Sequence, residues 1–173
     1  MRQLLLLRHA KSARDDPRLA DRDRPLNARG QRDAAAMRRA MRELGLVPDL
    51  VLVSPARRTM QTLEALEPWD DTPLTEPLEQ LYLADATQIL STLWNVAETV
   101  RSVLLIGHNP GLHAAALRLA AGSTGAMVQR LAAGLPTAAL AEFTVSGRWC
   151  DLSAGNARLI RFLSPAELQS AGT

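Results

Sequence analysis

Three continuous apolar runs along the chain each end in a short polar motif. They cover residues 3–8, 50–53 and 103–106. A continuous apolar run, rather than an alternating one, is typical of a strand buried on both faces of a parallel sheet. Two further runs, 138–145 and 157–163, enclose a Ser-Gly turn and also predict strands.

Segments with an apolar residue every third or fourth position separate the first runs and predict helices. Each begins at a residue whose side chain can cap a helix, and two of these are followed by Pro at the first helical position. A short final turn is predicted in the same way. The predicted caps are, in chain order, Asn27 (helix to about Leu44), Ser54 (to about Leu66), Asp85 with Gln88 as capping-box partner, Asn109 (to about Ala120) and Ser164 with Glu167.

Strands that alternate with helices predict one α/β domain over residues 1–173, with three layers (α/β/α) and a mostly parallel central sheet. Two segments lack a regular period. Residues 10–25 are dense in charge and predict a long loop, and residues 68–84 carry three prolines and read as irregular. Beyond residue 120 the chain reads as strand.

Composition narrows the class of protein. The chain is 47% hydrophobic and 22% charged, with a net charge of only +2, which is typical of a folded domain without a large nucleic-acid or membrane surface. Cys150 is the only cysteine, so an intrachain disulfide is impossible. The first residues are too short an apolar run for a signal peptide or a spanning helix, and we expect a cytoplasmic protein.

The motifs after the three strands share one kind of chemistry. Arg8-His9 follows the first strand, Ser54 to Arg57 the second, and Gly107-His108-Asn109 the third. Because the carboxyl ends of parallel strands meet at one edge of a sheet, we expect these residues to converge there. Arginines, imidazoles and helix N-termini without a carboxylate suit a dianion, and phosphate is the commonest candidate.

These motifs resemble those of the histidine phosphatase superfamily, the phosphoglycerate mutase-like enzymes, and most closely its short SixA-type phosphohistidine phosphatases. The resemblance covers nearly the whole chain. The first motif has Ala10 where the superfamily usually has Gly, which is a mild change if the residue has a negative φ. The matching segments are residues 6–12, 23–30, 51–62 and 107–111.

The resemblance implies catalytic roles for four side chains. His9 would attack phosphorus and carry a phosphohistidine intermediate, while Arg8, Arg57 and His108 would hold the phosphate oxygens. Arg58 is expected on a solvated helix face. The general acid that relatives place after the second motif would be Glu79 by register, with Glu76 as the second choice.

The resemblance also implies no cofactor and no metal, because the arginines take the place of a magnesium ion. The residues agree: His9, His108 and His113 do not make a metal site, since the last two lie on different helix faces without a carboxylate or thiol. Arg24 is expected to pair with Asp21 or Asp23 rather than with substrate.

The interval between the second and third motifs is too short for a large cap, so the site is expected to be open. An open site suits a phosphorylated protein, such as phosphohistidine on a signalling phosphotransfer domain, and equally a small phosphate ester. A phosphate-binding adaptor without activity is the alternative from another class. No nucleic-acid or membrane partner is expected, and the oligomeric state stays open.

Overall fold

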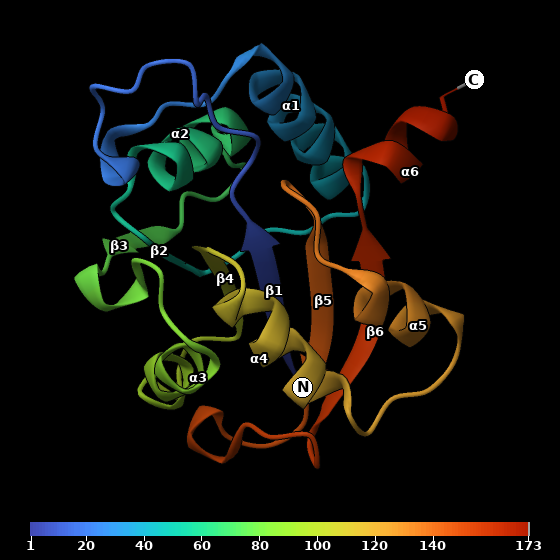
Figure 1. Cartoon of the computed structure of the whole chain (residues 1–173). Coiled ribbons are helices and arrows are strands. Elements are labelled where there is room, and N and C mark those ends of the chain that lie inside the picture. The colour runs from blue at the N-terminus through green and yellow to red at the C-terminus, as the bar shows by residue number, and fades with distance from the viewer. Residues whose placement is uncertain (173) are drawn as a thin grey trace.

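A six-stranded mixed sheet forms the middle layer of the protein (Figure 1), in the order β3-β2-β4-β1-β5-β6. The computed structural model describes residues 1–172. The first four strands in this order are parallel, and β5 and β6 run antiparallel to their neighbours. The strands are β1 (Arg2–Arg8), β2 (Leu50–Val53), β3 (Leu74–Pro77), β4 (Ser102–Gly107), β5 (Leu140–Val145) and β6 (Ala157–Leu163).

Helices cover both faces of this sheet, which confirms the predicted α/β class and layer order (Figure 1). In β1, Leu5 and Leu7 pack towards α1, α2 and α6, while Leu4 and Leu6 pack towards α3, α4 and α5. All four leucines are fully buried, as the continuous apolar run predicts. The helices are α1 (Ala28–Glu43), α2 (Arg57–Leu66), α3 (Ala86–Trp94), α4 (Gly111–Ala120), α5 (Ala126–Ala133) and α6 (Pro165–Ser170).

Three of the predicted helix starts are confirmed by their capping bonds. The Asn27 side chain accepts a hydrogen bond from the Gly30 N–H, and capping boxes begin α3 at Asp85 and α6 at Ser164. None of the helices in residues 1–172 is long and apolar enough to cross a membrane.

Two predicted helix starts are wrong by a few residues. α2 begins at Arg57 rather than after Ser54, because the Ser54 hydroxyl is engaged at the end of β2. α4 begins at Gly111, and Asn109 does not cap it: its amide donates to the Leu135 carbonyl instead.

The regions predicted without helices contain two elements that the sequence pattern did not reveal. α5 lies in a stretch predicted to be extended, and Leu131 is its only fully buried residue, so its apolar stripe is weak. β3 lies in the segment predicted to be irregular. All four of its residues are exposed and it pairs only with β2, so it shows no pattern of buried positions.

Candidate active site

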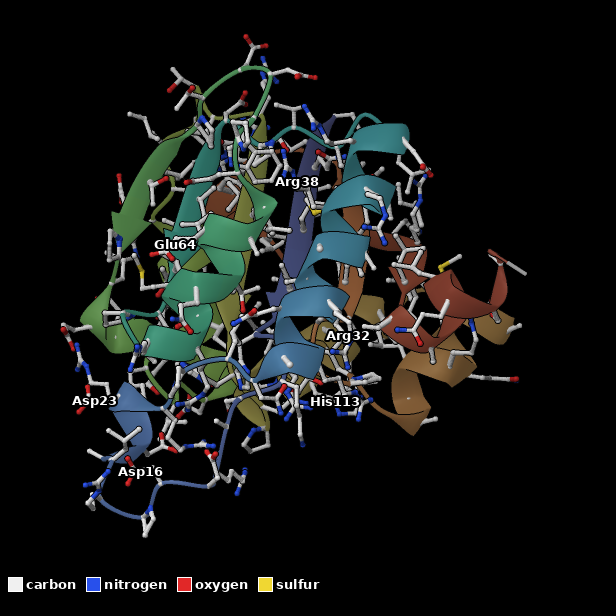
Figure 2. The ribbon with its side chains drawn as sticks, turned by 90° about the horizontal axis from the view of Figure 1, so that it is seen from above. Asp16, Asp23, Arg32, Arg38, Glu64 and His113 are labelled. Atoms are coloured by element: carbon white, nitrogen blue, oxygen red, sulfur yellow. The ribbon has the colours of Figure 1, made fainter. Side chains whose placement is uncertain are left out.

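The carboxyl ends of β1, β2 and β4 lie at one edge of the sheet, as the motifs predict. Arg8 is aligned with Gly107, and Val53 with Ile106. The residues that follow these strands are therefore neighbours: the rings of His9 and His108 have their centroids 5.3 Å apart. The long loop 10–25 covers the same end of the molecule. Figure 2 shows Asp16 and Asp23 on this loop, beyond the first turns of α1 and α2.

His9 is held in one tautomer. Its Nδ1 lies 2.7 Å from the carbonyl oxygen of Ala10, which can only accept, so Nδ1 carries the proton and donates. Nε2 is then left with a free lone pair. Ala10 has no positive φ, so its Cβ is accommodated without strain, and its N–H donates to the Thr62 hydroxyl. The backbone after His9 thus fixes the orientation of the ring.

His108 is also neutral in this arrangement. Its Nδ1 lies 3.3 Å from Nη2 of Arg58, which can only donate, so Nδ1 accepts. Nε2 then carries the proton and donates to the Ser54 hydroxyl at 2.7 Å. Ser54, which the sequence predicts to cap a helix, therefore orients the imidazole of His108 instead.

Arg58, and not Arg57, belongs to the site. Arg58 is 2% exposed and lines the cavity beside His9 and His108, whereas Arg57 is exposed and does not line it. Our expectation for this pair was thus reversed. Helix geometry is the reason: Arg58 shares a face with the buried Thr62 and Leu66, at a spacing of four residues. The outer face of α2 carries Glu64 (Figure 2).

A cavity of about 190 Å³ lies between these side chains. Asp21 is the one carboxylate among the described residues that line it. Two buried guanidinium nitrogens, Nε of Arg8 and Nε of Arg58, have no protein acceptor. The site therefore offers a surplus of positive charge and of hydrogen-bond donors, as an oxyanion site requires. Five basic residues line the cavity: Arg8, Lys11, Arg14, Arg24 and Arg58.

Asp21 connects loop 10–25 to the site. Its carboxylate accepts hydrogen bonds from Tyr82, Arg24 and Arg58, and its backbone carbonyl accepts a further one from Arg58. The pairing of Arg24 with Asp21 is confirmed, but Arg24 also lines the cavity. Asp21 fixes the direction of both guanidinium groups, and sequence reasoning gave it no such role. The available signal was its place three residues before Arg24, just ahead of the second matching segment (residues 23–30).

The electrostatics of the site favour neutral imidazoles. Burial, together with the positive charges of the nearby Arg58 and Arg8, lowers the pKa of His9 to about 4. Burial and Arg58 lower the pKa of His108 to about 3. The Tyr82 hydroxyl and the two arginines lower the pKa of Asp21, which is therefore ionised at neutral pH.

Glu79 does not reach the cavity. It is exposed, and it forms an ion pair with Arg22 at 2.5 Å, which lowers the pKa of its carboxyl group. An ionised, paired carboxylate outside the cavity cannot act as the general acid that the register suggested. His113 lies on α4 with its Nε2 against the Leu131 carbonyl, outside the residues that line the cavity.

Comparison with known proteins identifies relatives that match nearly the whole chain. The family model for the histidine phosphatase superfamily (branch 1) matches residues 4–79. An uncharacterised protein of Mycobacterium tuberculosis is 36% identical over 164 residues, which are 92% of this chain and 99% of that protein.

Solved structures of similar fold agree with this match. A candidate phosphohistidine phosphatase SixA from Agrobacterium tumefaciens superposes with a TM-score of 0.79 at 32% identity, over 95% of this chain and 98% of that one. The protein histidine phosphatase SixA in complex with tungstate gives a TM-score of 0.74 at 27% identity, over 96% and 99%.

Proposed function

This chain belongs to the histidine phosphatase superfamily, and we propose that it is a phosphatase that works through a covalent phosphohistidine on His9. The observation that carries the proposal is the tautomer of His9. Its Nδ1 donates to the Ala10 carbonyl, so Nε2 is free to attack, in a cavity lined by basic side chains.

The reaction has two steps. In the first, Nε2 of His9 forms a bond to phosphorus as the bond to the leaving group breaks, and the leaving group takes the electron pair. In the second, water attacks phosphorus, His9 leaves as the neutral imidazole, and phosphate and a proton are released. Arg8 and Arg58 stabilise the charge on the phosphate oxygens in both transition states. His108 lies beside these two arginines. We propose that catalysis needs no metal because the guanidinium groups supply the positive charge.

The absence of a protonated carboxyl group among the described residues that line the cavity favours phosphohistidine as the substrate. Asp21 is its one carboxylate and stays ionised, and Glu79 lies outside. An alkoxide leaves slowly without a general acid, whereas the imidazole of a protonated phosphohistidine leaves as a neutral group. The name of the tungstate-bound neighbour, a protein histidine phosphatase, supports the same substrate class.

We infer further that the protein acts on phosphohistidine carried by another protein, in the cytoplasm. Between α2 and β4 the described chain forms only β3, a short turn and α3, and no large cap segment lies there. A site open at the surface can receive a side chain presented by a folded partner.

The test is to trap the intermediate. We expect a ³²P-labelled phosphohistidine protein to label the wild-type chain transiently, with a label that is acid-labile and alkali-stable. The label should be absent in His9→Ala and in His9→Asn and present in His113→Ala, which removes a histidine outside the cavity. Labelling of His9→Asn, or turnover that persists in it, would refute the proposal. A higher kcat/KM on alkyl phosphates than on phosphohistidine would assign the small-ester activity instead, and phosphate binding without turnover would indicate an adaptor.

A further inference from the structure

Two basic residues of the cavity, Lys11 and Arg14, are not used by the proposed chemistry. Both line the cavity, and no carboxylate of residues 1–172 lies within ion-pair distance of either. Arg24 and Arg58, by contrast, both pair with Asp21. The part of the cavity formed by Lys11 and Arg14 therefore carries two positive charges that the described protein leaves uncompensated.

These two residues lie outward of the groups that act on phosphorus. His9 and Arg58 are buried, whereas Lys11 is half-buried and Arg14 is exposed. Arg14 is still close enough to lower the pKa of Arg8 by repulsion. Like charges placed together without a carboxylate between them are unfavourable in the free protein and become favourable when an anion binds.

The backbone that carries these side chains is fixed. Gly30 of α1 packs so closely that a Cβ there would lie 2.1 Å from the Lys11 carbonyl oxygen. The same carbonyl accepts a hydrogen bond from the Asn27 N–H, and Ala13 donates to the Pro25 carbonyl. Ser12 also forms an isolated bridge with Leu26, antiparallel in direction. Lys11 thus projects from an anchored segment (residues 11–13), and Arg14 comes directly after this segment. The backbone therefore loses little conformational entropy when an anion binds.

Charge balance indicates what this region binds. Five basic residues line the cavity against one carboxylate, while a phosphoryl group brings at most two negative charges. Arg8 and Arg58 are the guanidinium groups nearest the two imidazoles, and they suffice to hold the phosphoryl oxygens. A second anion would balance the two positive charges of Lys11 and Arg14.

We propose that Lys11 and Arg14 form a second anion subsite, which binds a carboxylate or phosphate group carried on the same molecule as the scissile phosphate. The inference rests on the proposed function, since it assigns substrate selectivity to the same cavity. The second anion comes either from an acidic residue that flanks a phosphohistidine in a protein or from a small molecule with two anionic groups.

Equilibrium binding tests the subsite without requiring turnover. Methylphosphonate and phosphonoacetate differ by one carboxylate, and calorimetry at mildly alkaline pH measures the affinity of the wild-type chain for each. We expect phosphonoacetate to bind about tenfold more tightly, and the ratio to fall towards one in Lys11→Ala/Arg14→Ala and with added salt. The control is Arg18→Ala/Arg57→Ala, which removes two exposed charges outside the cavity and should keep the ratio.

Kinetics then identify the source of the second anion. One pair of substrates is phenyl phosphate and carboxyphenyl phosphate, and the other is a phosphohistidine peptide with glutamate or with alanine beside the phosphorylated residue. A preference for the acidic member of either pair that is lost in Lys11→Ala/Arg14→Ala supports the subsite and names its ligand class. A ratio near one in the wild type, or a preference that the double variant keeps, overturns the inference. Absence of turnover on all four substrates would instead refute the proposed function, with the binding ratio still deciding on the subsite.

Discussion

The neighbouring residues Arg57 and Arg58 provide the sharpest test of the site. They have the same side chain and lie one residue apart in α2, yet Arg58 is 2% exposed beside the two imidazoles and Arg57 faces solvent. Arg58→Ala and Arg57→Ala are thus matched variants with equal changes in charge and volume. Only one of them alters the cavity.

The expected magnitude follows from the contacts of Arg58. Its Nη1 and Nη2 donate to the backbone and the carboxylate of Asp21 at 2.7 and 3.0 Å, and Nη2 also contacts His108. Arg58→Ala removes a positioned cation from the transition state and frees Asp21 from one of its partners. A lost donor of this kind costs about 3 kcal/mol of transition-state stabilisation, a decrease in kcat/KM of about 10² to 10³-fold. Arg57→Ala should change kcat/KM by less than about threefold.

Arg58→Lys separates charge from geometry. Lysine keeps the charge but lacks the planar fork that holds Asp21 with two nitrogens, so we expect an intermediate loss of about 10 to 100-fold. The assay is kcat/KM on p-nitrophenyl phosphate and on a phosphohistidine peptide, with thermal unfolding to confirm that each variant is folded. Equal losses in Arg57→Ala and Arg58→Ala, or near-wild-type activity in folded Arg58→Ala, would refute the assignment of Arg58.

Three further results are expected from the same geometry. The pKa of His9 is about 4 in the folded state and about 6.5 in the unfolded state. The contribution of the neutral His9 ring to the free energy of unfolding, up to about 3 kcal/mol, is therefore lost as the pH falls from about 6.5 to about 4. Denaturant unfolding from pH about 7 to about 4 measures this loss, and the free energy of unfolding should depend less on pH in His9→Asn. Ser54→Ala removes the acceptor of the His108 Nε2 proton, so it should lower the free energy of unfolding by about 1–3 kcal/mol and reduce kcat; unchanged values of both would contradict the tautomer. Gly30→Ala places a Cβ 2.1 Å from the Lys11 carbonyl oxygen, so we expect the free energy of unfolding to fall by about 2–4 kcal/mol, measured by thermal unfolding. A Tm equal to that of the wild type would show that α1 can move to make room for the methyl group.

The order of strands and helices and the edge at which the motifs meet could be predicted from sequence because each depends on local signals. Continuous apolar runs mark buried parallel strands, and side chains such as Asn27 and Asp85 mark helix starts. The prediction failed where the local signal was weak. β3 has no buried face, and α5 has a single fully buried residue.

The errors at Ser54 and Glu79 have a different cause, since each depends on a contact between distant segments. Ser54 is a good helix cap by its residue type, but in the folded chain its hydroxyl accepts from His108, 54 residues away. Glu79 fits the register of a general acid, but Arg22 of the long loop pairs with it outside the cavity. A polar side chain that could bond to several partners bonds to the one that the fold brings within reach. The residues next to it in sequence do not determine which partner this is.

By itself, the sequence determined the α/β class, the three strand ends and the presence of Arg8, His9 and His108 at a common edge, because strand burial and the parallel arrangement follow from residue pattern alone. The tertiary structure decided which arginine of α2 points inward, which carboxylate holds it, and which nitrogen of His9 is free. These depend on a rotation of about 100° per helical residue and on hydrogen bonds a few ångströms long, so a shift of one residue or one partner changes the chemistry while the pattern along the chain stays the same.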